Sequence, residues 1–196
     1  MRIYSYSQST KALGPYNRFA LWVAGCPFRC NNCMTPDAQS LDSGYEIDEV
    51  ALAKKINETV NNEGLTITGG EPFIHVKSLN ILLDNVSKDL GIVVYTGFTK
   101  DELIQKNCVQ TNKLLSRIDI LIDGQYVDNL NINDSLKGSS NQNIYQLTDR
   151  YENVFDQYYN HKKREVEIYL DKKDMMLVGI PTKNTLNKIN NLRIKE

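Results

Sequence analysis

The sequence predicts an α/β fold, in the form of a partial, open β/α barrel with a mostly parallel sheet and a C-terminal β-hairpin. Patterns of buried strands alternate with patterns of amphipathic helices as far as Ile122. This alternation produces right-handed βαβ units, and such units make parallel sheets. The 196 residues supply too few units for a complete eight-fold barrel. We expect a core domain over residues 1–150 and, over residues 151–196, an extension whose hairpin packs on that core.

The first elements lead to a group of cysteines. Residues 3–8 alternate weakly in polarity and predict a short first strand. A turn signal follows at residues 13–17. Residues 18–24 carry no charge after Arg18 and predict a buried strand. The carboxyl end of this strand delivers Cys26, and in parallel α/β folds ligands gather at the carboxyl ends of strands.

Three more strands are expected, each following a helix, because apolar residues recur at helical spacing between short β-rich runs. Caps and glycines mark the boundaries. The expected elements are a helix from an Asp48 cap to about Asn62 with Leu52, Ile56 and Val60 on its buried face, a strand over residues 65–68, a helix from a Ser78 cap to a stop at Gly91, a strand over residues 92–95, a helix behind a capping box at Thr99 and Glu102, a short helix near residues 113–116, and a strand over residues 118–122.

The remainder of the chain predicts a long loop and a hairpin. Residues 125–143 are polar and rich in Asn, Asp and Ser, and a loop of that length is functional or disordered. Residues 151–159 predict a helix. Residues 166–170 and 175–180 flank a turn at residues 171–174 and predict the hairpin. A short helix with Leu186 and Ile189 is expected to follow Pro181.

Composition excludes several classes of function. The net charge of −1 gives no general affinity for nucleic acid or for an anionic membrane. No apolar run reaches the roughly 20 residues that span a bilayer. The N-terminus lacks the layout of a signal peptide, so we expect a cytoplasmic protein. In that compartment clustered cysteines indicate metal or redox chemistry rather than structural disulfides.

The cysteines Cys26, Cys30 and Cys33 have the spacing C-x₃-C-x₂-C on one short loop. Cubane 4Fe-4S clusters usually take four cysteines, so three leave one iron open for a small molecule. Structural zinc, the main alternative, takes four protein ligands. The remaining candidates, Cys108, His75 and His161, lie outside the loop, and each is expected to be structural or exposed. The spacing favours an open iron–sulfur site over zinc, and a chance grouping is the third reading.

A second motif, Gly69-Gly70-Glu71-Pro72, directly follows the strand expected over residues 65–68. Two glycines at a strand end let the backbone approach a ligand closely. Glu71 adds an acceptor for an amine. Alone, the motif is equally well read as a plain turn from strand to loop.

Together the two motifs resemble those of the radical S-adenosylmethionine enzymes, which carry C-x₃-C-x₂-C and a later G-G-E-P. Within that superfamily the chain resembles the activating enzymes of glycyl-radical proteins, most of all those that act on anaerobic ribonucleotide reductase. The segments that carry this resemblance are residues 17–30 (Asn-Arg-Phe-Ala-Leu-Trp-Val-Ala-Gly-Cys-Pro-Phe-Arg-Cys), 66–73, 94–99, 119–124 and 138–142.

The resemblance implies a site. The metal ligands would be Cys26, Cys30 and Cys33 on a 4Fe-4S cluster, whose fourth iron would bind the amine and carboxylate of S-adenosylmethionine. The residues expected to bind that molecule are Gly69, Gly70 and Glu71 at its methionyl amine, Asn32, Cys33 and Met34 along its adenine, and Thr96 at its methionyl or ribose part, where a core or capping role is equally open. Asp123 and residues 139–142 would contact cofactor or partner, the alternative being a solvated loop.

The implied activity is that of an oxidoreductase. An electron from a flavodoxin or ferredoxin would cleave S-adenosylmethionine reductively, and the 5′-deoxyadenosyl radical would take a hydrogen atom from a glycine of a partner such as anaerobic ribonucleotide reductase. The hard chemistry belongs to the cofactors. Two alternatives remain: a small radical enzyme that modifies a peptide or metabolite, and a zinc-binding interaction module without catalysis.

Overall fold

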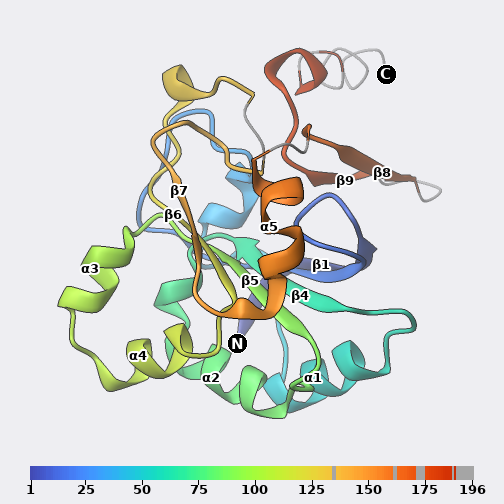
Figure 1. Cartoon of the computed structure of the whole chain (residues 1–196), viewed down its shortest axis with the longest axis vertical. Coiled ribbons are helices and arrows are strands. Elements are labelled where there is room, and N and C mark those ends of the chain that lie inside the picture. The colour runs from blue at the N-terminus through green and yellow to red at the C-terminus, as the bar shows by residue number, and fades with distance from the viewer. Residues whose placement is uncertain (134–135, 161–162, 171–174, 187, 189–196) are drawn as a thin grey trace.

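The computed structural model describes residues 1–133, 136–160, 163–170, 175–186 and 188 (Figure 1). Its strands are β1 (Arg2–Thr10), β2 (Arg18–Val23), β3 (Tyr45–Glu46), β4 (Gly64–Gly69), β5 (Gly91–Tyr95), β6 (Ile120–Asp123), β7 (Asn143–Gln146), β8 (Val166–Leu170) and β9 (Met175–Gly179). Its α-helices are α1 (Glu49–Glu58), α2 (Val76–Asn85), α3 (Lys100–Gln105), α4 (Val109–Leu115) and α5 (Glu152–Tyr159).

One seven-stranded sheet organises the chain, in the order β3-β1-β2-β4-β5-β6-β7. The central strands β2, β4, β5 and β6 are parallel, which confirms the predicted βα units. Strands β1, β3 and β7 join the edges in antiparallel fashion. A separate antiparallel hairpin, β8–β9, confirms the expected C-terminal element. The parallel strands carry their carboxyl ends to one edge of the sheet, where the connecting loops can converge.

Each face of the sheet is covered by a different part of the chain. Because side chains alternate along a strand, Phe19, Leu21 and Leu65 pack with α1–α4 on one face. Trp22 and Val93 lie on the other face, where the C-terminal segment supplies Tyr159 of α5 and Val178 of β9. Figure 1 shows α5 and the hairpin lying apart from α1–α4. The C-terminal segment therefore completes the core of the sheet.

Several helix boundaries differ from the expectation. Asp48 caps α1 as predicted, its side chain accepting from Ala51 N, but α1 ends at Glu58. Val60, expected on the buried face, is 79% exposed. α2 begins at Val76, so the predicted Ser78 cap is wrong. A 3₁₀ turn, Pro72–Ile74, directly precedes α2. The helix therefore begins two residues before the Ser78 that the sequence indicated as its cap.

Other local signals hold. The capping box at Thr99 and Glu102 is present at the start of α3. The edge strands β3 and β7 have no counterpart among the expected elements, because each is short and is stabilised by a neighbouring strand rather than by its own pattern. Residues 183–186 are helical as expected. The predicted turn at residues 171–174, His161 and Ile189 lie outside the described residues.

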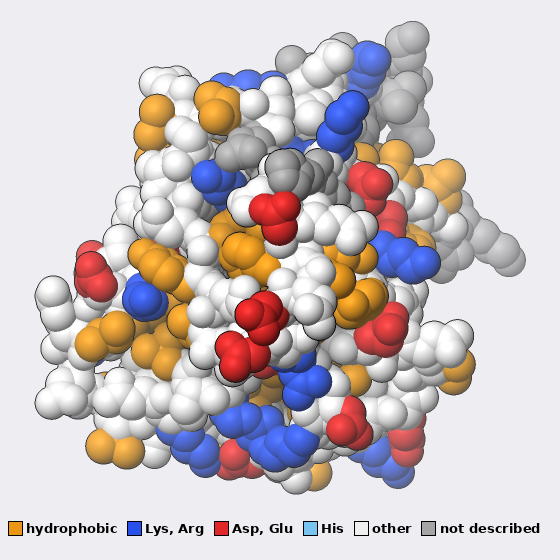
Figure 2. Space-filling model, in the orientation of Figure 1, with side chains coloured by type: hydrophobic (Ala, Val, Ile, Leu, Met, Phe, Trp, Pro, Cys, Tyr) orange, Lys and Arg blue, Asp and Glu red, His pale blue; other side chains and the backbone are white. Residues whose placement is uncertain are grey.

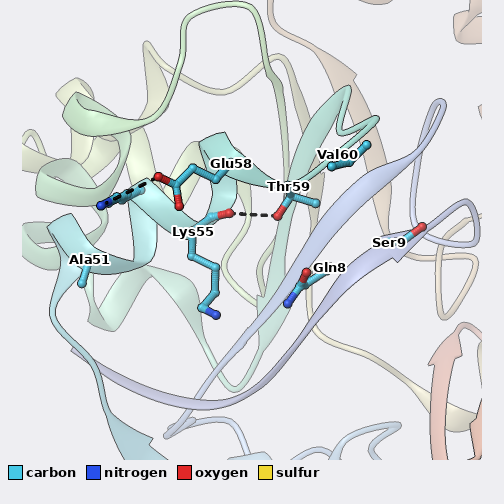
Figure 3. Close-up of a pocket in the computed structure, with 8 residues that line it drawn as sticks. Gln8, Ser9, Ala51, Lys55, Glu58, Thr59 and Val60 are labelled. Carbon is cyan, nitrogen blue, oxygen red and sulfur yellow. Dashed lines mark hydrogen bonds and ion pairs between the residues drawn. The ribbon is translucent and has the colours of Figure 1, made fainter.

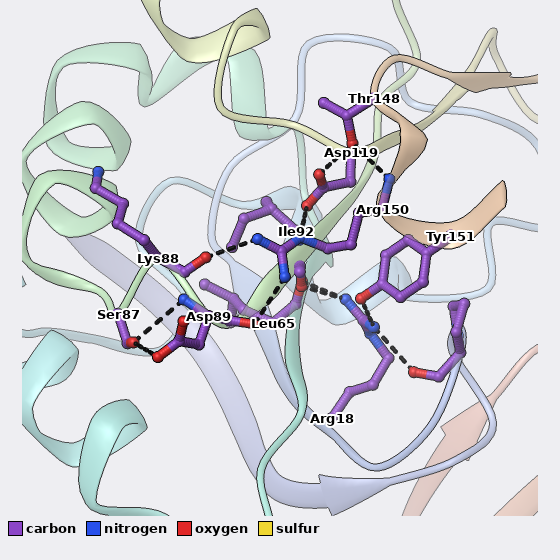
Figure 4. A network of polar contacts seen from close by, with 12 residues as sticks. Arg18, Leu65, Ser87, Lys88, Asp89, Ile92, Asp119, Thr148, Arg150 and Tyr151 are labelled. Atoms are coloured by element: carbon purple, nitrogen blue, oxygen red, sulfur yellow. Dashed lines mark hydrogen bonds and ion pairs between the residues drawn. The ribbon is translucent and has the colours of Figure 1, made fainter.

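The buried residue Arg18 joins the amino ends of three parallel strands (Figure 4). All five N–H donors of its guanidinium have an acceptor. These acceptors are Thr66 Oγ1 at 2.8 Å from Nε, Pro15 O at 2.9 Å and Tyr151 Oη at 2.7 Å from one terminal nitrogen, and Leu65 O at 3.0 Å and Gly91 O at 2.6 Å from the other. The Tyr151 ring also faces the guanidinium carbon, 5.5 Å from its centroid. The buried positive charge of Arg18 is tolerated because each of its N–H donors has a hydrogen-bond acceptor in the protein.

A second network attaches the same region of the chain. Asp119 accepts hydrogen bonds from Ile92 N and from the Thr148 hydroxyl, and it pairs with Arg150 (Figure 4). Arg150 in turn donates to the carbonyls of Lys88 and Asp89. The segment that leads into α5 is therefore bonded to the loops before β5 and β6.

Charged side chains of both signs are interspersed over the face of the molecule in Figure 2, in keeping with the net charge of −1. Among the helices of the described residues, none is long and apolar enough to cross a membrane.

We expect the change Arg18→Met to lower the free energy of unfolding by about 3 kcal/mol or more, because it leaves buried carbonyl and hydroxyl groups without their hydrogen-bond donor. Tyr151→Phe removes one of the five bonds and should cost about 1 kcal/mol. Both are measured by urea denaturation. The matched control is Arg2→Met: Arg2 also donates to three main-chain carbonyls, but at the surface. Equal losses for the Arg18 and Arg2 variants would contradict a special role of the buried guanidinium.

Candidate metal centre

The cysteine loop begins where β2 ends. Cys26, Cys30 and Cys33 are free, half-buried thiols in the segment between Val23 and the 3₁₀ turn that starts at Pro36. The main chain closes this segment, since Gly25 N donates to Ala38 O at 2.8 Å and Cys26 N to Gln39 O at 3.0 Å. The three thiols are thus presented from one closed loop at the carboxyl end of the sheet.

The surroundings of the thiols combine burial with main-chain donors. Burial raises the pKa of Cys26, while main-chain hydrogen bonds from Phe28 and Arg29 lower it less. Burial and the neighbouring Cys33 raise the pKa of Cys30, against a main-chain hydrogen bond from Tyr126. Thr35 N donates to Cys33 Sγ at 3.4 Å. Amide donors directed at sulfur stabilise thiolates and tune a metal that they bind, so this donor set fits a thiolate-ligated iron–sulfur cluster.

The glycine motif lies against the cysteine loop. Gly70 N donates to Val23 O at 2.8 Å, and Glu71 N donates to Gly25 O at 2.7 Å. Thr35, two residues beyond Cys33, donates its hydroxyl to Gly69 O at 2.9 Å. A Cβ atom at Gly70 would lie 2.1 Å from Gly25 O, so only glycine permits this approach. The structure therefore brings together the two motifs that the sequence separates by some forty residues.

The Glu71 carboxylate bonds three donors of the protein. Phe73 N donates to it at 2.9 Å, Gly97 N at 2.7 Å and the Thr96 hydroxyl at 2.7 Å. Burial raises the pKa of Glu71, against the lowering effect of these hydrogen bonds. Thr96 is itself buried, and its N–H donates to Ile122 O at the end of β6. Glu71 and Thr96 thus fasten the carboxyl ends of β4, β5 and β6 to one another.

The remaining residues expected at the site lie at the same edge. Asn32 is exposed, in the left-handed region with φ 53°, and its amide donates to Asp128 Oδ2 at 3.2 Å. Met34 packs against the apolar cluster that contains Trp22 and Val178. Cys108 is exposed at the start of α4, and His75 Nε2 bonds Ala24 O at 2.6 Å.

Asp123 and residues 139–142 shape the loop after β6. Asp123 is buried, and its carboxylate accepts from Lys100 N at 2.6 Å and from Asn143 N at 3.2 Å. Gln142 is buried as well; it donates to Gly124 O and accepts from Gly138 N. Asp123, Ser139 and Gln142 therefore are not part of a solvated loop, whereas Ser140 and Asn141 are exposed.

Two features went unrecognised in the sequence. Asp128 and Lys183 contact each other close to the cysteine loop, and only the polar composition of residues 125–143 hinted at the former. Within the described residues, no group of three or more His, Cys, Asp or Glu side chains converges on a point where a single metal ion would sit.

Surface hollows occur at both edges of the sheet in the described part of the chain. One lies beside the cysteine loop, lined by Cys26, Pro27, Arg29, Gln39, Leu41, Ile74 and His75. The other lies between β1 and α1, where Lys55, Thr59 and Gln8 line it (Figure 3). Thr59 and Val60 lead towards the amino end of β4, so this second hollow is at the opposite edge of the sheet from the cysteines.

Comparison with known proteins gives a family. The 4Fe-4S single cluster domain matches residues 12–145. The chain is 29% identical over 159 residues to the anaerobic ribonucleoside-triphosphate reductase-activating protein of Vibrio cholerae, covering 76% of this chain and 99% of the relative. The protein of that name in Escherichia coli K12 is 29% identical over 145 residues, covering 68% and 91%.

Another relative matches a shorter region. The pyruvate formate-lyase-activating enzyme of Listeria monocytogenes is 30% identical over 83 residues, which are 40% of this chain and 34% of that enzyme. These three relatives are all described as activating proteins or activating enzymes. The region that matches the family, residues 12–145, contains the cysteine loop.

We expect Thr96→Val to lower the free energy of unfolding by about 1–3 kcal/mol, because it leaves the buried Glu71 carboxylate short of a donor. Thermal or urea unfolding of the protein without metal measures this. Thr59→Val is the control, since its hydroxyl bonds Lys55 O at an exposed site (Figure 3), and should stay within about 0.5 kcal/mol.

The same carboxylate predicts a pH dependence. Since the pKa of Glu71 is raised in the folded protein, the folded state holds its proton more tightly than the unfolded chain. The contribution of Glu71 to stability therefore falls as pH rises from the unfolded pKa, about 4.3, through the raised folded value. Glu71→Gln should remove this component, so the difference in melting temperature between variant and parent should change across weakly acid pH; a constant difference argues against a raised pKa.

Proposed function

The chain belongs to the 4Fe-4S single cluster domain family, and from this premise we propose that it is a radical S-adenosylmethionine enzyme that activates a glycyl-radical protein such as anaerobic ribonucleotide reductase. One observation carries the proposal: a loop with three thiols is hydrogen-bonded directly to the Gly69–Glu71 edge of the next parallel strand. A centre with one open iron would there adjoin a backbone edge suited to an amino-acid group.

The residues that would hold the cofactors are those that the family resemblance implies. We assign the cluster to Cys26, Cys30 and Cys33. We assign S-adenosylmethionine to Gly69, Gly70 and Glu71 at the methionyl end, to Asn32, Cys33 and Met34 at the adenine, and to Thr96 between them. The side chains of Glu71 and Thr96 bond each other, so their contribution is to position the strand ends. The amides of Gly70 and Glu71 already donate to Val23 O and Gly25 O, so the carbonyl oxygens of the motif, which can accept a second hydrogen bond, would be the groups that meet the methionyl amine.

A cluster held by Cys26, Cys30 and Cys33 would supply the electron for reductive cleavage of S-adenosylmethionine to methionine and a 5′-deoxyadenosyl radical, and that radical would take a hydrogen atom from a glycine Cα. The protein's own part is to orient and to exclude water. Phe28 of the cysteine loop packs edge-on against Phe98 at 4.8 Å between ring centroids, which covers one side of the loop. The main-chain donors described above partly offset the burial that raises the pKa of Cys26 and Cys30.

Further parts of the proposal concern the setting of the enzyme. The electron donor would be a flavodoxin or ferredoxin, the location cytoplasmic, and no nucleic acid would take part. We further propose that the sheet curves as a partial barrel, and that residues 1–150 form the radical core and residues 151–196 an extension. The four parallel strands and the packing of α5 and β9 on one sheet face support this division.

Anaerobic reconstitution tests the proposal. The purified chain, given iron, sulfide and a reductant, should take up about four irons and four sulfides and cleave S-adenosylmethionine to deoxyadenosine. Cys30→Ala should abolish cleavage, and Cys108→Ala, the matched control at an exposed thiol, should retain it. Zinc uptake without iron would instead identify a binding module.

The partner is tested separately by electron spin resonance. Mixing the reduced protein with an anaerobic ribonucleotide reductase should produce the doublet of a glycine-centred radical. Deoxyadenosine formed without that doublet on any glycyl-radical protein would assign the chain to the enzymes that modify a peptide or metabolite.

A further inference from the structure

We propose that Asp128 is a positioning residue for the cysteine loop, which it holds through the side chain of Asn32. The effect of Asp128 on a bound cluster rests on the proposed function. The contacts of Asp128 with the cysteine loop do not, because they are present in the protein without a cluster. Asp128 lies in the long loop of residues 125–143, at the start of the 3₁₀ turn Asp128–Leu130. Its role depends on residues from three separate parts of the chain.

The first part is the cysteine loop itself. Asn32 lies between Cys30 and Cys33 and has a left-handed backbone, with φ 53°. Asparagine tolerates this conformation better than most residues, but the conformation still has to be held. The Asn32 amide donates to Asp128 Oδ2 at 3.2 Å, so the carboxylate fastens the turn that separates two cysteines.

The second part is the loop that carries Asp128. The Tyr126 hydroxyl donates to Asp128 Oδ1 at 2.7 Å, and Asn131 donates to the same hydroxyl at 3.2 Å. The loop therefore contacts the cysteine segment at Asn32, through Asp128.

The third part is the C-terminal extension. Lys183 Nζ donates to Asp128 O at 2.8 Å and lies 3.5 Å from Asp128 Oδ2. Arg164 donates to Asn131 Oδ1 at 2.8 Å and to Lys137 O at 2.6 Å. The extension thus holds the loop, and the loop holds the cysteines. This order gives the extension a function at the site although it supplies no cysteine.

A carboxylate suits this position because it accepts from several donors at once. Oδ2 accepts from Asn32 and faces Lys183 Nζ, and Oδ1 accepts from Tyr126. Asp128→Asn would keep an acceptor oxygen but not the charge that faces Lys183. Asp128→Ala would leave Asn32 and Tyr126 without their acceptor, and Lys183 would keep only the main-chain carbonyl of residue 128. Comparing the parent with the variants Asp128→Asn and Asp128→Ala therefore separates the effect of the acceptor oxygen from the effect of the charge.

The test measures the accessibility of thiols in the protein without iron. Iodoacetamide is added at fixed pH, and the alkylation rate of each cysteine is followed by peptide mass spectrometry. Asp128→Ala should raise the rates at Cys30 and Cys33 by about five-fold or more, since loss of the anchor lets the loop open. Cys108 is the internal reference, and Asp84→Ala is the matched control, because Asp84 pairs with Lys113 at 2.7 Å at a remote surface.

Asp128→Asn distinguishes positioning from charge. If the carboxylate acts by holding Asn32, the Asn variant should stay close to the parent. If its charge alone slowed alkylation, Asn would match Ala, and the proposal would be wrong. Rates within two-fold of the parent in the Ala variant would also overturn it.

Folding is monitored by circular dichroism and melting temperature. Should Asp128→Ala fail to fold, Lys183→Met serves instead, because it removes an outer contact of the carboxylate; a smaller rise at Cys30 and Cys33 is expected, and no rise overturns the proposal. In the reconstituted enzyme, Asp128→Ala should alter the spin-resonance spectrum of the cluster and raise the KM for S-adenosylmethionine more than it lowers kcat. Alkylation of the iron-free protein decides the positioning role even if cleavage is never observed.

Discussion

The buried guanidinium of Arg18 is the interaction on which the rest of the sheet depends. It bonds carbonyls next to or within β2, β4 and β5 and the hydroxyl of Tyr151, and so it fixes the amino ends of the central strands. A Cβ atom at Gly64 would lie 2.5 Å from its Cζ, so the strand start leaves room for the charge only as glycine. Because these hydrogen bonds stabilise the amino edge of the sheet, the loops at the carboxyl edge can contain functional residues without destabilising the fold.

At the carboxyl edge of the sheet a second buried polar group, Glu71, connects the strand ends. The Glu71 carboxylate joins the ends of β4 and β5, while the amides of Gly70 and Glu71 bond the main chain at the end of β2. A carboxylate with three protein donors is rigid, and rigidity is what a site needs when it must hold a reactive ligand in one orientation. The cysteine loop is hydrogen-bonded to this frame through Thr35, whose hydroxyl donates to Gly69 O and whose amide donates to Cys33 Sγ.

The C-terminal segment is part of both arrangements. Tyr151 is an acceptor for Arg18 at the amino edge, and Lys183 reaches Asp128 at the carboxyl edge. Residues of α5 and β9 also cover the sheet face that α1–α4 leave open. A segment that reads as an appendage in the sequence is therefore linked to the stability of the core and to the geometry of the cysteine loop.

The sequence by itself determined the elements and the motifs. Periodicity predicted the βα units and the hairpin, and the spacing of Cys26, Cys30 and Cys33 with Gly69-Gly70-Glu71 indicated the family, because these signals are local and carry their chemistry in residue type. Only the tertiary structure decided where buried polar groups find partners. Asn32 meets Asp128 across 96 positions and Arg18 meets Tyr151 across 133, and no local pattern encodes such pairs. The edge strands β3 and β7 were missed for the same reason: neighbours distant in sequence, rather than propensity, decide where those strands form.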